Sequence, residues 1–133
     1  MSSSGFLDRT PTVQVVIENP LLRRAYPSAG AVTAIIDSGY QGFLCVPKQV
    51  FLQLGLNKLS NESREISLAD GSFSRSKGCY ATLVYPHLAM KIDGFVETFR
   101  GLDEVLVGVE ALVQTRVVLD YCSGKVRIDK CNP

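Results

Sequence analysis

The sequence predicts an all-β fold, a small closed or sandwiched arrangement of short strands with one or two short helices. Runs of β-branched and aromatic residues recur along the 133 residues, turns containing glycine or proline separate them, and helical spacing is confined to short segments. No linker-like stretch divides the chain. We therefore expect one domain spanning residues 1–133, with residues 1–11 flexible.

The first half of the chain is expected to contain three strands and a helix. Apolar and β-branched runs define the strands, which we place at Val13–Ile17, Ala31–Ile36 and Phe43–Val46. The second of these is largely apolar, so we expect it to be buried on both faces. Apolar spacing between Pro47 and Gly55 predicts a helix over Lys48–Leu54. Leu21–Gly30 is interpreted as a connection and Asn57–Ser63 as a loop.

Asp-Gly between two strand-like runs is a strong hairpin signal, and the second half of the chain contains it twice. Asp70-Gly71 is expected to join Glu65–Ala69 to a strand that begins at Phe73 and ends before Pro86. Asp93-Gly94 is expected to join two further strands in the same way. These two strands are placed at Leu88–Ile92 and Phe95–Phe99. An apolar strand is expected at Val105–Gly108 and one or two helical turns at Glu110–Val113. A last hairpin is expected to pair Val117–Leu119 with Val126–Ile128.

Charge and hydropathy exclude several classes of partner. The formal net charge is +1, and basic residues do not cluster beyond the pair Arg23-Arg24, so we expect no nucleic acid partner. No apolar run is long enough to cross a bilayer, and the N-terminal residues lack the apolar core of a signal peptide. We expect no membrane association and a cytoplasmic location.

The cysteines and the single histidine do not predict a metal site. Cys45, Cys79, Cys122 and Cys131 are widely spaced, and His87 stands in no ligand spacing with them. We therefore expect buried or incidental thiols, no metal and no cofactor. A disulfide between Cys122 and Cys131 remains an alternative, since two strands would bring them together.

The tripeptide Asp37-Ser38-Gly39 directly follows the apolar run Ala34-Ile35-Ile36 and occurs once. Aspartate and serine are common turn formers, so a simple turn is one interpretation. An apolar strand that delivers an acid into a glycine-containing turn also places a carboxylate at the edge of a core. Further motifs follow in order: Phe43-Leu44-Cys45-Val46-Pro47, Leu68-Ala69-Asp70-Gly71, and Val105-Leu106-Val107-Gly108 with Leu112.

In order and spacing, these motifs resemble those of the retropepsin-like aspartic proteases, the family of retroviral proteases and their single-domain cellular and archaeal relatives. The resemblance extends from about Val13 to Ile128. It implies a small closed β-barrel of the retropepsin-like acid protease type. It also implies an aspartic endopeptidase that is active as a homodimer, because one copy of the tripeptide supplies half of an active site.

The resemblance also assigns roles to residues of this chain. Asp37 and its symmetry mate would activate a water molecule, while Ser38 and Gly39 would support the active-site loop. Gly108 would let its strand pass close behind that loop. The flap that contacts a peptide or unfolded protein substrate would contain Ala69, Asp70, Gly71 and Ser72. Strands Val126–Ile128 or Val13–Ile17 would join the two subunits.

Two other functions remain open. The first is a non-catalytic dimeric β module of the same fold that binds peptides or partner proteins; an intact Asp-Ser-Gly disfavours it, since a binder needs no paired carboxylates. The second is a metal-dependent hydrolase using Asp37 or Asp70, which lacks the usual histidine and acidic clusters. A serine or cysteine triad is disfavoured because His87 is the only histidine.

Overall fold

A computed structural model describes residues 3–68 and 70–131, and it is mostly β-strand. The strands are β1 (Ser4–Leu7), β2 (Thr10–Asn19), β3 (Arg24–Tyr26), β4 (Val32–Ile36), β5 (Leu44–Cys45), β6 (Glu62–Ser67), β7 (Phe73–Tyr85), β8 (Met90–Phe99), β9 (Val105–Val107), β10 (Thr115–Asp120) and β11 (Lys125–Lys130). The helical segments are α1 (Lys48–Gln53) and three 3-10 turns, η1 (Leu56–Lys58), η2 (Pro86–Leu88) and η3 (Val109–Ala111). The all-β prediction is therefore confirmed.

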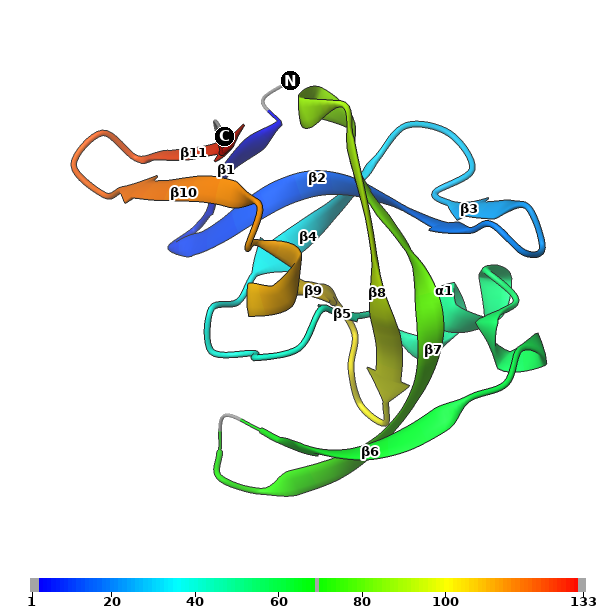
Figure 1. The fold of residues 1–133 in the computed structure, drawn as a ribbon. Helices are drawn as coiled ribbons and strands as arrows, with labels where there is room; N and C mark the ends of the chain where they lie inside the picture. Colours follow the sequence, from blue (N-terminus) through cyan, green and yellow to red (C-terminus); the bar gives the residue numbers. More distant parts are fainter. Residues whose placement is uncertain (1–2, 69, 132–133) are drawn as a thin grey trace.

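The main sheet closes on itself. Its strand order is β1-β2-β4-β9-β5-β8-β7-β6, and an additional pairing of β2 with β7 closes the six strands from β2 to β7 in this order into a ring. The pairs β4–β9 and β5–β8 are parallel, whereas the other pairings in the sheet are antiparallel. Figure 1 shows β6 and the adjoining half of β7 extending beyond this ring as a long hairpin.

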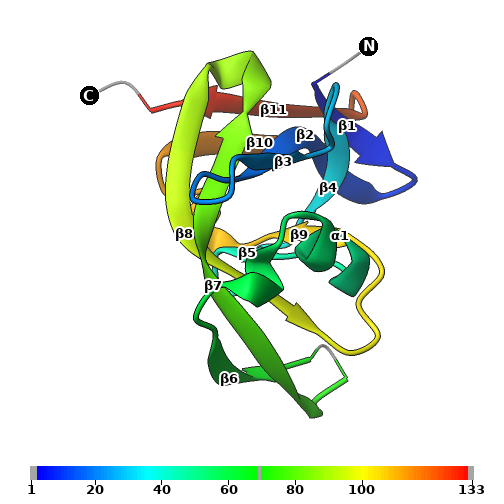
Figure 2. The same cartoon turned by 90° about the vertical axis from the view of Figure 1, so that its right-hand side faces the viewer.

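The core lies inside the ring, where side chains of alternate residues meet. Val13, Val15 and Ile17 of β2 have no exposed surface, as the period-two pattern of a half-buried strand requires. Helix α1 contributes the buried Val50 and Phe51 from one side (Figure 2). The helix ends where the sequence predicts, because Gly55 adopts a left-handed φ of 71°.

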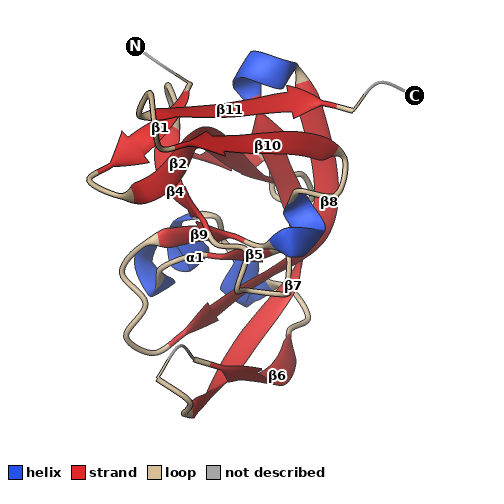
Figure 3. Cartoon of the chain, turned by 90° about the vertical axis from the view of Figure 1, so that its left-hand side faces the viewer, coloured by secondary structure: helices blue, strands red, loops and turns tan. Residues whose placement is uncertain are grey.

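Both ends of the described chain meet at one end of the molecule. Strands β10 and β11 form a separate two-stranded sheet across that end (Figure 3). Ser4 on β1 donates from its Oγ to the Val126 carbonyl oxygen at 2.7 Å. Of residues 1–11, which we expected to be flexible, residues 4–7 form β1, which pairs with β2 and packs near β11, and residues 1–2 lie outside the described residues.

The strands suggested as subunit contacts are parts of β2 and β11. Val13 pairs with β1 and β4, and Ile17 pairs with β3 and β7, so both edges of β2 are occupied at these two residues. Val126 and Ile128 are 5% and 3% exposed. Exposed apolar side chains occur at several places on the surface, and four of them belong to β10 and its flanking turns, namely Val113, Val118, Leu119 and Tyr121.

The predicted hairpin at Asp93-Gly94 is wrong. Strand β8 runs unbroken through both residues, opposite Thr82 and Ala81 of β7. Thr82 donates from its hydroxyl to the Asp93 carboxylate at 2.7 Å, which accommodates an acid within the strand. Gly94 makes room for a ring, since a Cβ at this position would clash with Phe43. The reversal occurs earlier, at η2.

Smaller differences concern the first half of the chain. The Leu21–Gly30 connection contains the short strand β3, and the Asn57–Ser63 loop contains the end of η1 and the start of β6. Strand β4 is buried on one face only, where Ala34 and Ile36 point to the core. The four cysteines are free: Cys45 and Cys79 are buried, and Cys122 and Cys131 are exposed. Within residues 3–68 and 70–131, no helix has the length and apolar character to span a membrane.

Candidate active site

Asp37 lies where β4 ends beside β9. The parallel pairing of β4 and β9 continues one residue past the strand, because the Asp37 N–H donates to the Val107 carbonyl oxygen at 2.9 Å. Its side chain is half-buried. A carboxylate is therefore attached to a backbone that is hydrogen-bonded to the neighbouring strand β9.

A tight turn follows Asp37. The Gly39 N–H donates to the Asp37 Oδ1 atom at 3.0 Å, and the Tyr40 N–H donates to the Asp37 carbonyl oxygen at 3.1 Å. Ser38 and Gly39 are exposed at the tip of the turn. The first bond orients one carboxylate oxygen toward the backbone.

Gly108 packs directly behind this turn. A Cβ on Gly108 would clash with the Gly42 carbonyl oxygen and the Tyr40 ring. The backbone φ of Gly108 is −93°, so the requirement is for space and not for an unusual conformation. The N–H groups of Gly108 and Val109 donate to the carbonyl oxygens of Phe43 and Tyr40, both at 2.9 Å. The structure thus brings Asp37, Ser38, Gly39 and Gly108 into one packed unit.

A fully buried carboxylate, Glu97 of β8, lies next to this unit. It accepts hydrogen bonds from the Tyr40 hydroxyl, from Ser76 Oγ at 2.6 Å, and from Arg64 Nη2 at 2.6 Å and Nε at 3.4 Å. The Arg64 guanidinium also lies 4.4 Å from the centre of the Phe95 ring. Glu97 therefore joins the loop after β4 to the hairpin strands β6 and β7.

Burial controls the ionisation of the groups around Glu97. Burial raises the pKa of the Tyr40 phenol well above its usual value, and it raises the pKa of the Cys45 thiol to about 12. The hydrogen bond to Glu97 raises the pKa of the Arg64 guanidinium. Neutral Tyr40 is thus a hydrogen-bond donor and Arg64 a cation throughout the ordinary pH range.

A cleft separates the turn after Asp37 from the β6–β7 hairpin. It has a volume of 440 Å³ and is lined by residues 39–42 on one side and by residues 64–67 of β6 on the other, with Glu110. Arg64 and Tyr40 belong to both the cleft wall and the Glu97 junction. The width of the cleft is therefore tied to that junction.

The predicted flap residues lie at the far end of the hairpin, away from this cleft wall. The Asp70 Oδ1 atom accepts hydrogen bonds from the N–H and Oγ of Ser72, at 2.9 and 2.5 Å, and these bonds lower the pKa of Asp70. Gly71 has a φ of 86°, which closes the turn. Ala69 lies outside the described residues. Asp70, Gly71 and Ser72 do not line the cleft.

Arg64, Ser76 and Glu97 are the site residues that sequence reasoning missed. One signal was available: Glu97 interrupts the apolar run from Gly94 to Phe99, and an acid within such a run requires a buried partner. The identity of that partner depends on the β6–β7–β8 register, which the sequence does not specify. Within the described part of the chain, no group of three or more histidine, cysteine or acidic residues is arranged to hold a metal ion.

Comparison with known proteins gives one informative match. No protein-family model matches the chain. The chain is 41% identical over 126 residues to an uncharacterized protein of Archaeoglobus fulgidus, and the match covers 95% of this chain and 98% of that protein. Identity of this extent over both full lengths shows common ancestry, so this chain belongs to the same family as the uncharacterized archaeal protein.

Proposed function

We propose that this protein is an aspartic endopeptidase of the retropepsin-like type, active as a homodimer. The observation that carries the proposal is the position of Asp37. Its backbone is bonded into the parallel β4–β9 pair, while the turn that follows is exposed at Ser38 and Gly39. A rigid backbone with one open side suits a carboxylate that must face an identical carboxylate from a second subunit.

The proposed chemistry needs both copies of Asp37. Two carboxylates within hydrogen-bonding distance share one proton, because two like charges this close do not both ionise. The ionised partner accepts a proton from a water molecule as that water attacks the peptide carbonyl carbon. The protonated partner donates to the carbonyl oxygen. The tetrahedral intermediate then collapses, and the amine leaves with a proton. The titration belongs to the pair and not to either aspartate alone.

The turn residues have supporting roles in this proposal. The Gly39 N–H holds Asp37 Oδ1 at 3.0 Å, which fixes the plane of the carboxylate. Ser38 is exposed next to it, so its hydroxyl is available to a second subunit. Gly108 keeps the turn packed against the sheet, because any side chain there would displace it. These contacts support a site whose precision comes from the scaffold.

The hairpin and the cleft supply a place for substrate. An extended peptide in the 440 Å³ cleft would lie between residues 39–42 and β6. Backbone groups of a strand edge bind such a peptide by adding it to the sheet, largely independently of its sequence. Unfolded proteins and extended peptide segments are therefore the proposed substrates.

The decisive experiment compares proteolysis by the wild type and by Asp37→Asn. An unfolded protein substrate is incubated with each across pH 3 to 7, and cleavage is followed by mass spectrometry. Asp8→Asn is the matched control: Asp8 is exposed in a turn with a φ of 56°, which asparagine also tolerates. Cleavage by the wild type and the control, but not by Asp37→Asn, is the expected result.

The oligomeric state gives an independent check. Analytical ultracentrifugation is expected to give a dimer, and mixing the wild type with excess Asp37→Asn should inhibit activity by forming mixed dimers. A strict monomer would contradict the mechanism, because one Asp37 does not make a pair. A stable dimer that cleaves nothing at any pH would instead support the non-catalytic binding module.

A further inference from the structure

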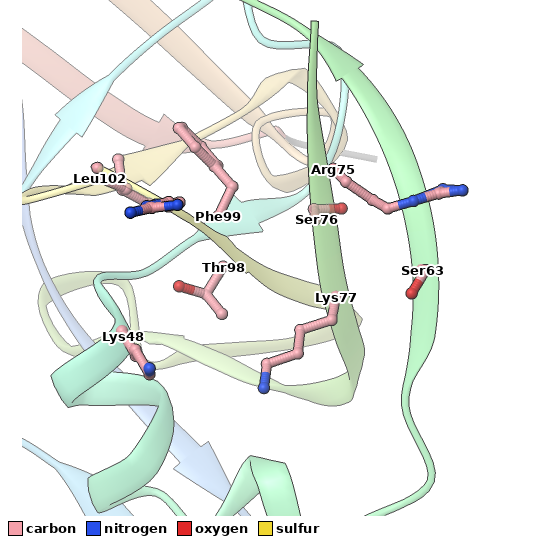
Figure 4. Close-up of a pocket in the computed structure, with 10 residues that line it drawn as sticks. Lys48, Ser63, Arg75, Ser76, Lys77, Thr98, Phe99 and Leu102 are labelled. Atoms are coloured by element: carbon pink, nitrogen blue, oxygen red, sulfur yellow. The ribbon is translucent and has the colours of Figure 1, made fainter.

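A second cavity lies on the opposite side of the β6–β7 hairpin from the cleft. It has a volume of 640 Å³ and is bounded by β7, the end of β8, the loop that follows β8, and the first residue of α1 (Figure 4). Ser63 contributes from β6 and Leu102 from the loop. None of the Asp37-Ser38-Gly39 residues lines it, so its chemistry is separate from that of the proposed active site.

The charged side chains that line this cavity are basic. Among the described residues, Lys48, Arg75, Lys77 and Arg100 line it, and no acidic residue does. Across residues 3–68 and 70–131, none of these four cations forms a salt bridge. Glu65 faces Arg75 across the β6–β7 pair but makes no ion pair with it. Four of the 14 basic residues of the chain thus line this one cavity.

An unpartnered buried hydroxyl adds an independent observation. Thr98 is 4% exposed, and its Oγ1 atom has no hydrogen-bond partner among the described residues. Its side chain is part of the cavity wall, and Figure 4 shows it pointing into the space between Lys48 and Leu102. Buried polar atoms in proteins are nearly always hydrogen-bonded, so an orphan of this kind needs an explanation. A ligand that accepts a hydrogen bond in the cavity provides one.

We propose that this cavity binds a small anion with at least two phosphoryl groups. Each of the four cations is exposed to water, and one contact between exposed charges contributes little. Only a ligand that contacts several of them at once would be held well. Lys48 and Lys77 extend on the same side of Thr98, whereas Arg75 extends toward Ser63 (Figure 4). One phosphoryl group therefore contacts Lys48, Lys77 and the Thr98 hydroxyl, and a second is needed to interact with an arginine of the cavity wall.

Inorganic pyrophosphate is the probe that tests this site. Isothermal titration calorimetry of the wild-type protein is expected to give one pyrophosphate site per chain. Orthophosphate should bind at least about tenfold more weakly than pyrophosphate, since one charge-assisted hydrogen bond corresponds to about tenfold in affinity. The double variant Lys48→Gln/Lys77→Gln should lose at least about a hundredfold by the same reasoning. Lys125→Gln/Lys130→Gln on β11 removes the same charge elsewhere and should bind as the wild type does.

The variant Thr98→Val separates binding from folding. The hydroxyl has no protein partner, so its loss should leave the urea midpoint unchanged or raised, while pyrophosphate binding weakens by about three- to tenfold. Equal affinity for pyrophosphate and orthophosphate, or equal losses in both lysine double variants, would overturn the proposal, because either result indicates attraction to overall charge. None of these measurements depends on proteolysis, so the site stands or falls separately from the proposed function.

Discussion

Replacing Glu97 by leucine is expected to destabilise the fold by about 3 kcal/mol. Removing one partner of a buried ion pair costs about 3–5 kcal/mol, because the other charge is left without compensation. The Arg64 side chain is 40% exposed, so water partly solvates it and the cost falls at the lower end of that range. Tyr40 and Ser76 also lose their acceptor. Of a typical total stability of about 5–15 kcal/mol, this is a large share.

The coupling between Glu97 and Arg64 is measured by a double-mutant cycle. Glu97→Leu, Arg64→Met and the double variant are unfolded in urea and followed by far-UV circular dichroism, since the chain has no tryptophan. Protein concentration is held fixed, because association adds to apparent stability. Two apolar side chains replace the pair in the double variant, so we expect it to be at least about 1.5 kcal/mol more stable than the sum of the single losses predicts.

Additive losses, to within about 0.5 kcal/mol, would refute this reasoning, because Arg64 and Glu97 would then act independently. The exposed pair Lys91–Glu18, with N and O atoms 3.1 Å apart, is the control cycle. Its side chains are 65% and 33% exposed, and surface pairs of this kind contribute about 0–1 kcal/mol. A coupling at the control pair as large as that at Glu97 would indicate that burial is not the cause.

Three further outcomes are expected. Burial raises the pKa of the Cys45 thiol from 9.0 to about 12, so the stability due to its neutral form is complete below pH 9 and is lost as the pH rises toward 12. The urea midpoint of the wild type should therefore fall between pH 9 and pH 12, and that of Cys45→Ala should fall less steeply. A thiol reagent at pH 8 should modify the two exposed cysteines quickly and the two buried ones only after unfolding. Gly94→Ala should lower the free energy of unfolding by about 1–3 kcal/mol, because its Cβ would clash with Phe43. Gly5→Ala is the control and should lower it far less, because a Cβ at Gly5 meets no atom within 4 Å.

Local signals in the sequence predicted most of the strands and the helix correctly. Pro47 and Gly55 bracket α1 as the helix signals require, and the period-two pattern of β2 matches its burial. The failure at Asp93-Gly94 has a specific cause. The dipeptide favours a tight turn locally, but the long-range contact of Gly94 with Phe43 and the bond from Thr82 to Asp93 favour a continuous strand.

The candidate site contains some residues that are neighbours in sequence and others that only the fold brings together. Asp37, Ser38 and Gly39 are neighbours in sequence, so their grouping was visible before the fold was known. Glu97 and Arg64 are 33 residues apart and meet only through the strand register. The sequence contains both residues but not the pairing of β6, β7 and β8 that brings them together.

The Arg64–Glu97 pair also determines which part of the hairpin is able to swing. Arg64 and Ser76, which face each other in the β6–β7 register, are both tied to Glu97. Beyond them, only the pairs Glu65–Arg75, Ile66–Ser74 and Ser67–Phe73 precede the turn. At about 3.3 Å per residue, this leaves a lever of roughly 10 Å with its pivot at the salt bridge. We therefore expect the hairpin to move more at its tip than at its base, which Glu97 connects to the Asp37 turn through Tyr40.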